Sequence, residues 1–382
     1  MKPTFLIAAL TGLTLLAGCA GNDVAPRNPP AELTDFEPDV ELESLWREGA
    51  GDGLGRATYP IAPARDGDAL FAADYRGELF AFDADDGSAR WEVELEAPVS
   101  SALTAVAGDI YLGTRDGEVL AVDQGDGEVR WRARVPSEVL AAPQPNQQLL
   151  VVQSIDGTIT ALDRTSGEER WSYQANLPSL TLRGTGTPTT IDPVTFAGFA
   201  NGRLVTLDNR NGQPLWERRI AMAEGRSDIE RLVDIAAQPV LTPDGRLFVT
   251  SYNGRLVALQ ATRGEPLWTK ELSSFSTPVV VGNRLYVVEE SGRILALDAD
   301  SGDEEWRSDV LRGRQPTAPA YADGQLVFGD FDGYLHLIDA SSGEVSARER
   351  IDGSGIGVRP VTEDNRIHVL ANDGSLETLD IR

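Results

Sequence analysis

The sequence predicts an all-β protein built as one closed, eight-bladed β-propeller of four-stranded antiparallel blades. Three observations support this prediction. A pattern with a period of about 40 residues recurs through the chain, its last copy is incomplete, and a copy of the missing piece lies near residues 41–50. Sheets repeated at such a period bury their faces by stacking radially, which gives a propeller.

The repeat is clearest in residues 77–91. It has a Gly, then Ala four residues later, Asp at six, Gly at ten and Trp at fourteen. The seventh copy has Ala347 where the others have Trp, and the eighth ends before that position. The eight copies begin at Gly77, Gly117, Gly157, Gly202, Gly254, Gly292, Gly333 and Gly374.

Each part of the repeat has a structural explanation. The first Gly follows residues such as Asn or Asp between two apolar runs, which predicts a tight hairpin with positive φ at the glycine. The Asp-x-x-x-Gly segment predicts a second turn, capped by the Asp side chain. The Trp lies on the following strand and packs across to a neighbouring sheet. With a Pro-containing strand upstream, each repeat supplies four antiparallel strands.

The N-terminal part of this region predicts how the ring closes. Residues 42–48 (LESLWRE) are similar to residues 127–133 (GEVRWRA), which form an outer strand of the pattern. We therefore expect residues near 41–50 to complete the eighth blade, because this removes the exposed edges of an open array. The alternative is a solenoid with free ends.

The first residues predict secretion. Residues 1–18 form a signal peptide with Lys2 at its start and an apolar run from Phe5 to Leu16, which is short for a membrane span. The following Leu-Ala-Gly-Cys19 segment resembles the lipobox of bacterial lipoproteins, which implies cleavage before Cys19 and lipidation of its thiol. An ordinary signal peptide followed by a chance cysteine is the alternative.

The resemblance to lipoproteins also predicts a location and a domain plan. Ala20, rather than Asp, follows the cysteine, which indicates anchoring at the periplasmic face of the outer membrane. Residues 19–40 are rich in Pro, Asn and Asp without an apolar period, so we expect the lipidated Cys19 and a flexible tether. Residues 41–382 then form the propeller.

Composition excludes several classes of function. The formal net charge is −26, which argues against nucleic-acid binding, because that needs a basic surface. One cysteine permits no intrachain disulfide, and two histidines exclude a three-histidine metal site. Two acidic turns, at residues 83–87 and 298–302, lack the bidentate Glu of a calcium loop. We therefore predict no metal and no catalytic residues.

The repeat itself raises one enzymatic alternative. Its Ala-x-Asp-x-x-x-Gly-x-x-x-Trp pattern resembles the PQQ-type propeller repeat of quinoprotein dehydrogenases, which implies a bound quinone as a rival hypothesis. Those enzymes hold the quinone against a Trp and a disulfide of adjacent cysteines, whereas this chain has only Cys19. The prediction is a binding scaffold without a cofactor.

Two consecutive insertions interrupt the repeat. The distances from Trp171 to Trp216 and from Trp216 to Trp268 exceed the 40 residues between earlier copies. Both insertions join an outer strand to the next inner strand, so we expect them on one face, side by side. Residues 176–186 carry Leu180 and Leu182 beside Arg183, and residues 221–237 contain a capping box, Ser227 to Glu230, that predicts a short helix.

Apolar residues among charges suit a protein contact. The alternatives are that the leucines tuck under the loop and plug the ring, or that residues 179–182 pair with a partner strand. A glycan-binding propeller is also open, although the insertions contain no Trp, Tyr or Phe.

The whole pattern resembles the BamB family of lipoproteins, part of the outer-membrane barrel-assembly (Bam) complex. The matching segments are residues 177–184, 188–190 and 229–234, and the likeness covers nearly the whole chain. The resemblance implies binding to the POTRA domains of BamA through Leu180, Leu182, Arg183 and Asp234. The family often has an acid where this chain has Ala236, so one polar contact is missing or replaced.

The same resemblance implies the biological role and the partners. It implies a non-catalytic scaffold that aids folding and insertion of outer-membrane proteins, as a monomer within the complex. The other Bam subunits are expected partners, and nascent outer-membrane β-barrel proteins are a further candidate.

Overall fold

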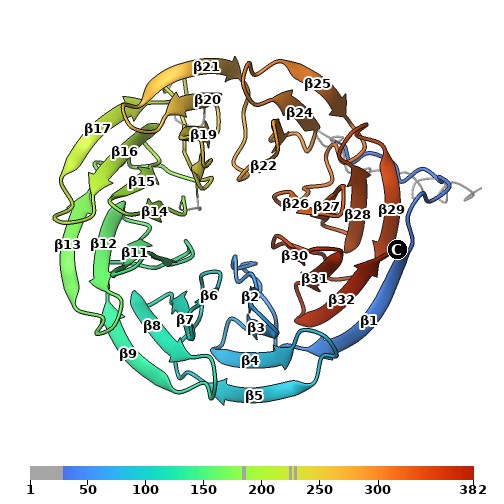
Figure 1. Ribbon diagram of the computed structural model, residues 1–382, viewed down its shortest axis with the longest axis horizontal. Coiled ribbons are helices and arrows are strands. Elements are labelled where there is room, and N and C mark those ends of the chain that lie inside the picture. Colours follow the sequence, from blue (N-terminus) through green and yellow to red (C-terminus); the bar gives the residue numbers. More distant parts are fainter. Residues whose placement is uncertain (1–28, 183–185, 223–225, 228–229) are drawn as a thin grey trace, which may run out of the picture.

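The computed structural model describes residues 29–182, 186–222, 226–227 and 230–382. Within these residues, 32 strands form eight four-stranded sheets arranged around a central axis (Figure 1). The sheets are antiparallel, which confirms the predicted eight-bladed all-β propeller. Over the same residues, no helix has the length and apolar character needed to cross a bilayer.

The strands of each blade follow one another from the axis to the rim. The innermost strands are β2 (Ala64–Asp66), β6 (Thr104–Val106), β10 (Gln144–Pro145), β14 (Thr189–Ile191), β18 (Val240–Leu241), β22 (Val279–Val281), β26 (Ala320–Ala322) and β30 (Val361–Glu363). The second strands are β3 (Ala69–Ala73), β7 (Asp109–Gly113), β11 (Leu149–Gln153), β15 (Val194–Gly198), β19 (Arg246–Thr250), β23 (Arg284–Val288), β27 (Gln325–Gly329) and β31 (Arg366–Leu370).

The two outer positions complete each sheet. The third strands are β4 (Glu78–Asp83), β8 (Glu118–Asp123), β12 (Thr158–Asp163), β16 (Arg203–Asp208), β20 (Arg255–Gln260), β24 (Ile294–Asp298), β28 (Tyr334–Asp339) and β32 (Ser375–Ile381). The outermost strands are β5 (Ala89–Glu94), β9 (Val129–Arg134), β13 (Glu169–Gln174), β17 (Pro214–Arg219), β21 (Glu265–Glu271), β25 (Glu304–Ser308), β29 (Val345–Arg350) and β1 (Leu42–Gly49).

The ring closes through β1, as the sequence predicts. This N-terminal strand pairs antiparallel with the C-terminal strand β32, with Trp46 opposite Thr378, and the sheet order is β1-β32-β31-β30. Figure 1 shows β1 at the rim of blade 8, beside the red C-terminal strands. The two ends of the propeller are therefore held in one sheet, and the solenoid alternative is wrong.

The repeat tryptophans join neighbouring blades. In blade 1, the indole Nε1 of Trp91 donates to the carbonyl oxygen of Gln124 in blade 2 at 2.9 Å. The ring packs on a turn glycine, because a Cβ atom added to Gly127 would lie 3.0 Å from Trp91. An indole Nε1 also donates to a backbone carbonyl oxygen of the next blade in Trp46, Trp131, Trp171, Trp216, Trp268 and Trp306.

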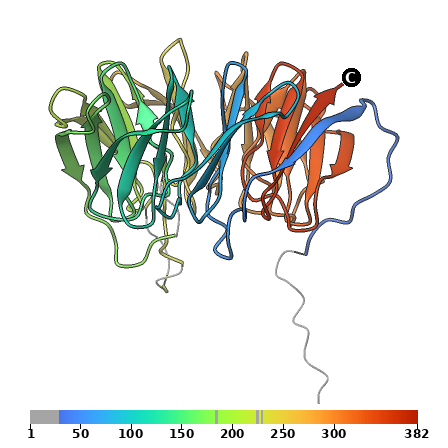
Figure 2. The same cartoon turned by 90° about the horizontal axis from the view of Figure 1, so that it is seen from below.

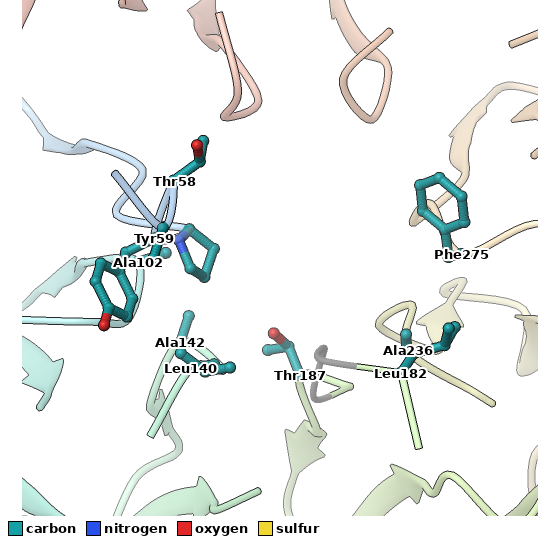
Figure 3. A pocket seen from close by; sticks show the side chains of 11 residues that line it. Thr58, Tyr59, Ala102, Leu140, Ala142, Leu182, Thr187, Ala236 and Phe275 are labelled. Atoms are coloured by element: carbon teal, nitrogen blue, oxygen red, sulfur yellow. The ribbon is translucent and has the colours of Figure 1, made fainter. Parts of the chain in front are cut away.

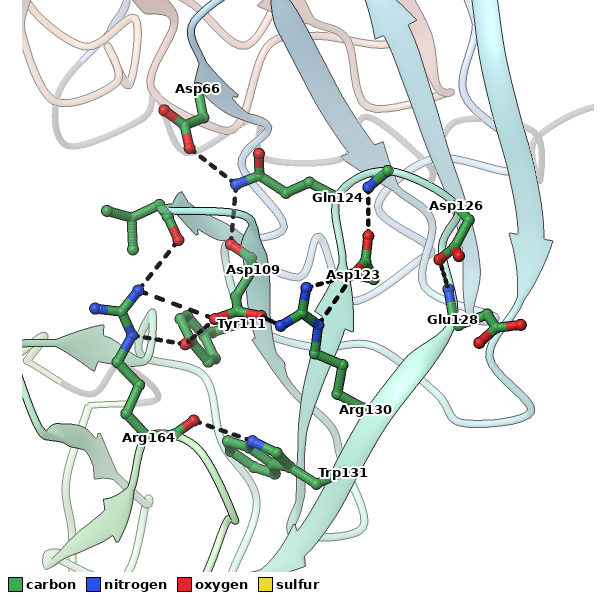
Figure 4. A network of polar contacts seen from close by, with 12 residues as sticks. Asp66, Asp109, Tyr111, Asp123, Gln124, Asp126, Glu128, Arg130, Trp131 and Arg164 are labelled. Carbon is green, nitrogen blue, oxygen red and sulfur yellow. Dashed lines mark hydrogen bonds and ion pairs between the residues drawn. The ribbon is translucent and has the colours of Figure 1, made fainter.

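The repeat aspartates cap turns, as predicted. Asp123 Oδ1 accepts from the backbone N–H of Gly125 at 2.7 Å, and Asp123 Oδ2 accepts from Arg130 Nε at 3.1 Å (Figure 4). Figure 4 also shows Arg164 donating to the Tyr111 hydroxyl at 2.9 Å, which links blade 3 to blade 2. Burial raises the pKa of Tyr111 to about 12, so this hydroxyl stays neutral. The repeat aspartates therefore stabilise turns of the propeller.

The two faces of the ring differ. One face is formed by the hairpins between the second and third strands of each blade and by the connections between blades, and we call it the loop face. On the loop face, the connections form backbone hydrogen bonds with the hairpins; for example, Ala175 N donates to Gly157 O at 3.0 Å. In seven of the eight hairpins the predicted glycine has positive φ; in the fifth, Asn253 takes this conformation at 48° instead of Gly254.

Residues 29–41 have no regular secondary structure, and part of this segment contacts blade 7. Asp39 N donates to Ser346 O at 2.9 Å. Figure 2 shows the described N-terminal segment descending along the rim to the side of the ring where the long β13–β14 and β17–β18 connections protrude. Residues 1–28, with the predicted signal peptide and lipidated Cys19, lie outside the described residues.

Candidate functional site

The two insertions lie side by side on the loop face, at the boundaries of blades 3 and 4 and of blades 4 and 5 (Figures 1 and 2). Each is held by an asparagine in the hairpin of the following blade. Asn201 Nδ2 donates to Asn176 O at 2.8 Å, and Asn253 Nδ2 donates to Leu232 O at 2.9 Å. The same device therefore positions both connections on the ring.

The predicted contact residues of the first insertion have different environments. Leu180 is 45% exposed, so it does not plug the ring. Leu182 is half-buried and lines a cavity at the mouth of the central channel. Leu177 packs inward, because a Cβ atom at Gly157 would lie 2.8 Å from its Cγ. Arg183 lies outside the described residues.

Asp234, the predicted contact of the second insertion, is buried. Its side chain is 2% exposed, and its carbonyl oxygen accepts from Tyr252 N at 2.8 Å. Its Oδ2 has no hydrogen-bond partner among the described residues, and neither has Gln153 Oε1. Both residues line a cavity of about 20 Å³, which has room for one water molecule. Burial raises the pKa of Asp234 to about 7.

The capping box of the second insertion forms, but the described part contains no helix. Glu230 N donates to Ser227 Oγ at 3.2 Å, and the Glu230 carboxylate accepts from Arg226 N at 2.7 Å and Ser227 N at 3.2 Å. These backbone donors lower the pKa of Glu230. The hydrogen bond of 3.1 Å from Arg231 N to Ser227 O closes one turn, and residues 226–227 and 230–231 are turns or bends.

Sequence reasoning missed other exposed apolar residues on the loop face. Met222 in the second insertion is 50% exposed, Phe275 in the β21–β22 connection 49%, and Ile155 in the β11–β12 hairpin 40%. With Leu180 these residues follow the loop face from blade 3 to blade 6, and we call the four the apolar arc. Comparing the residue two before each hairpin Gly would have found Ile155, since Arg115 occupies that position in the preceding repeat.

The arc borders the central channel. A cavity of about 410 Å³ at the channel mouth is lined by Leu182, Ala236 and Phe275 on one side and by Tyr59 and Leu140 on the other (Figure 3). A second cavity of about 980 Å³ continues along the channel and shares Phe275 with the first. The β13–β14 connection, which carries Leu182, and the β21–β22 connection, which carries Phe275, therefore both border this opening.

Both histidines lie in strands, His336 in β28 and His368 in β31. His336 and His368 are fully buried; His336 Nε2 lies 2.8 Å from Asp330 Oδ2, and His368 Nδ1 lies 2.7 Å from Thr378 Oγ1. Burial lowers the pKa of His368 to about 4, so it is neutral at pH 7. The described part of the chain has no cluster of three or more His, Cys, Asp or Glu side chains arranged for a metal ion.

Solved structures with the same architecture include proteins with different functions. BamB from Moraxella catarrhalis superimposes with a TM-score of 0.81 at 25% identity, covering 89% of this chain and 100% of that chain. A quinohemoprotein alcohol dehydrogenase from Comamonas testosteroni has a TM-score of 0.71 at 13% identity, with coverage of 89% and 76%. The second likeness shows the shared fold alone.

Sequence comparison identifies the family. The family model described as outer membrane protein assembly factor BamB matches residues 40–132, 105–308 and 290–382. Proteins of that name are 45% identical in Pseudomonas aeruginosa, over 98% of both chains, and 33% identical in Escherichia coli K12, again over 98% of both. The chain therefore belongs to the family of the outer membrane protein assembly factor BamB.

Proposed function

We propose that this chain is a non-catalytic scaffold of the outer-membrane β-barrel assembly complex, anchored at the periplasmic face of the outer membrane. It binds the POTRA domains of BamA through the loop face and thereby supports folding and insertion of outer-membrane proteins. The observation that carries the proposal is the apolar arc, because its members lie on and beside the two insertions that distinguish this propeller from a regular one.

The arc is suited to a protein partner. Leu180 and Met222 project from the two insertions at 45% and 50% exposure, and Phe275 at 49% extends the same surface. Exposed apolar residues that gather on one face mark binding sites more often than scattered ones do. Arg183, next to Leu182 in the sequence, supplies a charged group for the polar rim that such interfaces have.

Asp234 supports this surface from below. Its carbonyl oxygen fixes the second insertion to the Tyr252 hairpin, while its buried carboxyl group faces the cavity under Thr181 of the first insertion. Direct contact between this carboxyl group and a partner needs a rearrangement of the insertions, since the side chain is 2% exposed. We therefore propose that Asp234 positions the site.

Anchoring follows from the lipobox. Acylation of Cys19 with more than one chain gives stable membrane attachment. A Cys19→Ser protein is expected to appear in the soluble periplasmic fraction, and mass spectrometry of the N-terminal peptide reports the lipid directly. An unmodified Cys19 would remove the anchor from the proposal and leave the loop-face interaction to be judged separately.

Calorimetric titration of residues 20–382 with the POTRA region of the cognate BamA tests the interaction. Leu180→Asp and the double variant Leu182→Ala/Arg183→Glu are expected to weaken binding at least tenfold. The matched control is Leu215→Asp, because Leu215 is 55% exposed but lies on the outer strand β17, away from the arc. Circular dichroism establishes that each variant is folded.

The outcomes separate the hypotheses. Equal weakening by Leu180→Asp and Leu215→Asp would place the interface elsewhere. No binding by the wild-type chain would overturn the POTRA interaction, and glycan binding would then be tested with peptidoglycan fragments. A quinone or calcium ion retained by the purified protein would favour the dehydrogenase-like alternative.

A further inference from the structure

Residues 31–40 form a strap across the outer edge of blade 7. At one end, Ala31 N donates to Arg312 O at 2.7 Å. At the other end, Asp39 N donates to Ser346 O in β29 at 2.9 Å, and Val40 packs on the core cluster of blades 7 and 8. The strap is therefore held by backbone hydrogen bonds at both ends before the chain enters β1.

Two arginines of the propeller also contact the strap, Arg348 at its middle and Arg314 at its Ala31 end. Arg348 Nη1 donates to Thr34 O at 3.1 Å, and its guanidinium lies 5.0 Å from the centre of the Phe36 ring. Arg314 Nη1 donates to Ala31 O at 3.3 Å. A cation over an aromatic face is attractive, so Phe36 adds a side-chain contact to the main-chain bonds.

These arginines are themselves fixed from below. Arg314 Nε donates to Asp330 Oδ2 at 2.7 Å, and Asp330 is fully buried. Arg348 Nε lies 3.3 Å from Nδ1 of the buried His336. Blade 7 is also the blade with Ala347 in place of the repeat tryptophan. The strap therefore rests on a preorganised polar network at the point where the repeat departs from its pattern.

The Ala31 end of the strap lies on the loop face. Ala31 contacts Arg312 in the β25–β26 connection, and this connection belongs to the loop face. Figure 2 shows the beginning of the described chain, near residue 29, on the same side of the ring as the two long connections. The described N-terminal segment therefore reaches the side of the propeller that carries the apolar arc, although β1 itself lies at the rim.

We propose that the strap is an orienting device, which turns the loop face toward the membrane that holds the lipid anchor. The inference rests on the proposed acylation of Cys19. With the strap docked, the link from Cys19 to the propeller is residues 19–30, which span at most about 40 Å. If the strap were free, the link would be residues 19–40, and it would span at most about 75 Å.

The shorter link has a consequence for the partner. The loop face carries the arc, so a domain bound to the arc lies on the membrane side of the propeller, within the reach of the docked link. The opposite face is farther away by the height of a blade, since the six residues of β28 rise about 20 Å. Orientation by the strap therefore presents the binding surface to membrane-proximal domains.

Energy transfer to a membrane acceptor tests this orientation. The full lipidated chain is placed in phosphatidylethanolamine and phosphatidylglycerol vesicles that contain an acceptor lipid. A donor dye is attached to Ser354→Cys on the loop face or to Ser342→Cys on the opposite face; both positions are exposed. Cys19, the chain's only natural cysteine, is blocked by its lipid, so the dye marks one site.

Transfer from position 354 is expected to be at least twice as efficient as transfer from position 342. The variant Ala31→Pro/Phe36→Ser removes one backbone donor and the ring under Arg348, and is expected to bring the two efficiencies together. The control Glu32→Ser/Glu37→Ser changes two exposed positions of the same segment and is expected to behave like the wild type.

Equal efficiencies in the anchored wild-type protein, or an unchanged ratio in the strap variant, would overturn the orienting role. Wild-type protein that does not stay with the vesicles would overturn the anchor, and with it this inference. Neither result bears on the loop-face interaction, because the calorimetric titration uses the chain without its lipid.

Discussion

The indole Nε1 of Trp46 donates a hydrogen bond of 3.2 Å to the carbonyl oxygen of Ala84, and this contact joins the N-terminal strand to blade 1. The ring also packs on Gly87, where an added Cβ atom would lie 2.6 Å from Trp46 Cδ2. Trp46 thus makes between blades 8 and 1 the contact that the repeat tryptophans make elsewhere. The chain ends are joined by pairing within blade 8 and by this ring between blades.

Replacing Trp46 is expected to weaken the closed ring. Trp46→Ala removes a buried indole and should lower the free energy of unfolding by about 3–5 kcal/mol. Trp46→Phe keeps part of the volume but loses the donor to Ala84, so a smaller loss that includes about 1 kcal/mol for the hydrogen bond is expected. Denaturant unfolding measures both, and a loss below about 1 kcal/mol for Trp46→Ala would contradict the closing role.

Gly87 offers a test of the packing alone. Gly87→Ala combines backbone strain at φ +75° with the approach to Trp46, whereas Gly108→Ala has φ +86° and open space around the new Cβ atom. The strain is shared, so the difference between the two variants reports the clash. We expect Gly87→Ala to be less stable than Gly108→Ala by about 1–3 kcal/mol. Equal thermal midpoints would mean that the Trp46 ring moves aside freely.

The fold was predictable because its determinants are local and repeated. A hairpin Gly, a capping Asp such as Asp83, and a Trp at fixed spacing specify each blade, so eight copies reinforce one interpretation. The closing strand was visible as well, because residues 42–48 carry the pattern of an outer strand without the rest of a repeat. Such signals depend on neighbours in sequence.

The site was less predictable because exposure depends on neighbours in space. Asp234 was expected to meet a partner, yet the bond from Tyr252 N to its carbonyl oxygen draws the residue beneath the surface. Phe275 was overlooked because it lies in a connection of ordinary length. The strap was expected to be part of a free tether, since its contacts use backbone groups and one ring, Phe36, which leave no apolar period.

The turn aspartates are expected to matter more as caps than as ion pairs. Asp163 Oδ1 accepts from the backbone N–H groups of Thr165 and Ser166, each at 3.0 Å, and Arg170 donates to Oδ2 at 2.7 Å. Arg170 is 53% exposed, so Arg170→Gln should cost less than about 0.5 kcal/mol. Asp163→Ala leaves turn donors unpaired and should cost about 1 kcal/mol or more. Equal losses in denaturant unfolding would contradict this order.

The same contacts predict a pH dependence for this turn. The bond from Arg170 and the backbone donors lower the pKa of Asp163 to about 2. A carboxyl group with a lowered pKa in the folded state stabilises that state above its unfolded pKa of about 4, and the contribution is lost as the pH falls toward 2. Relative to Asp163→Asn, the wild-type protein should therefore lose stability between pH 4 and pH 2. Parallel profiles for the two proteins would exclude this contribution.

Asp234 is expected to have the opposite pH dependence. Burial raises its pKa to about 7 in the folded chain, above about 3.9 in the unfolded chain. The folded state therefore holds a proton that the unfolded state has released, so the stabilising contribution is complete below about pH 4 and is lost as the pH rises to about 7. Asp234→Asn keeps the shape and cannot ionise. Its advantage over the wild type should grow across this range, by on the order of 4 kcal/mol at most.

The comparison isolates one carboxyl group, because all other titrating groups are shared by the two proteins. Asp126→Asn is the matched control, since it makes the same change of side chain at an exposed position in the β8–β9 turn. Urea unfolding at half-unit steps from pH 4 to pH 8 measures the three proteins. If the stability profile of Asp234→Asn also runs parallel to that of the wild type, a partner stabilises the ionised carboxylate. Water in the cavity beside Gln153 is such a partner. Its role beneath the two insertions would then be that of an ordinary charged side chain.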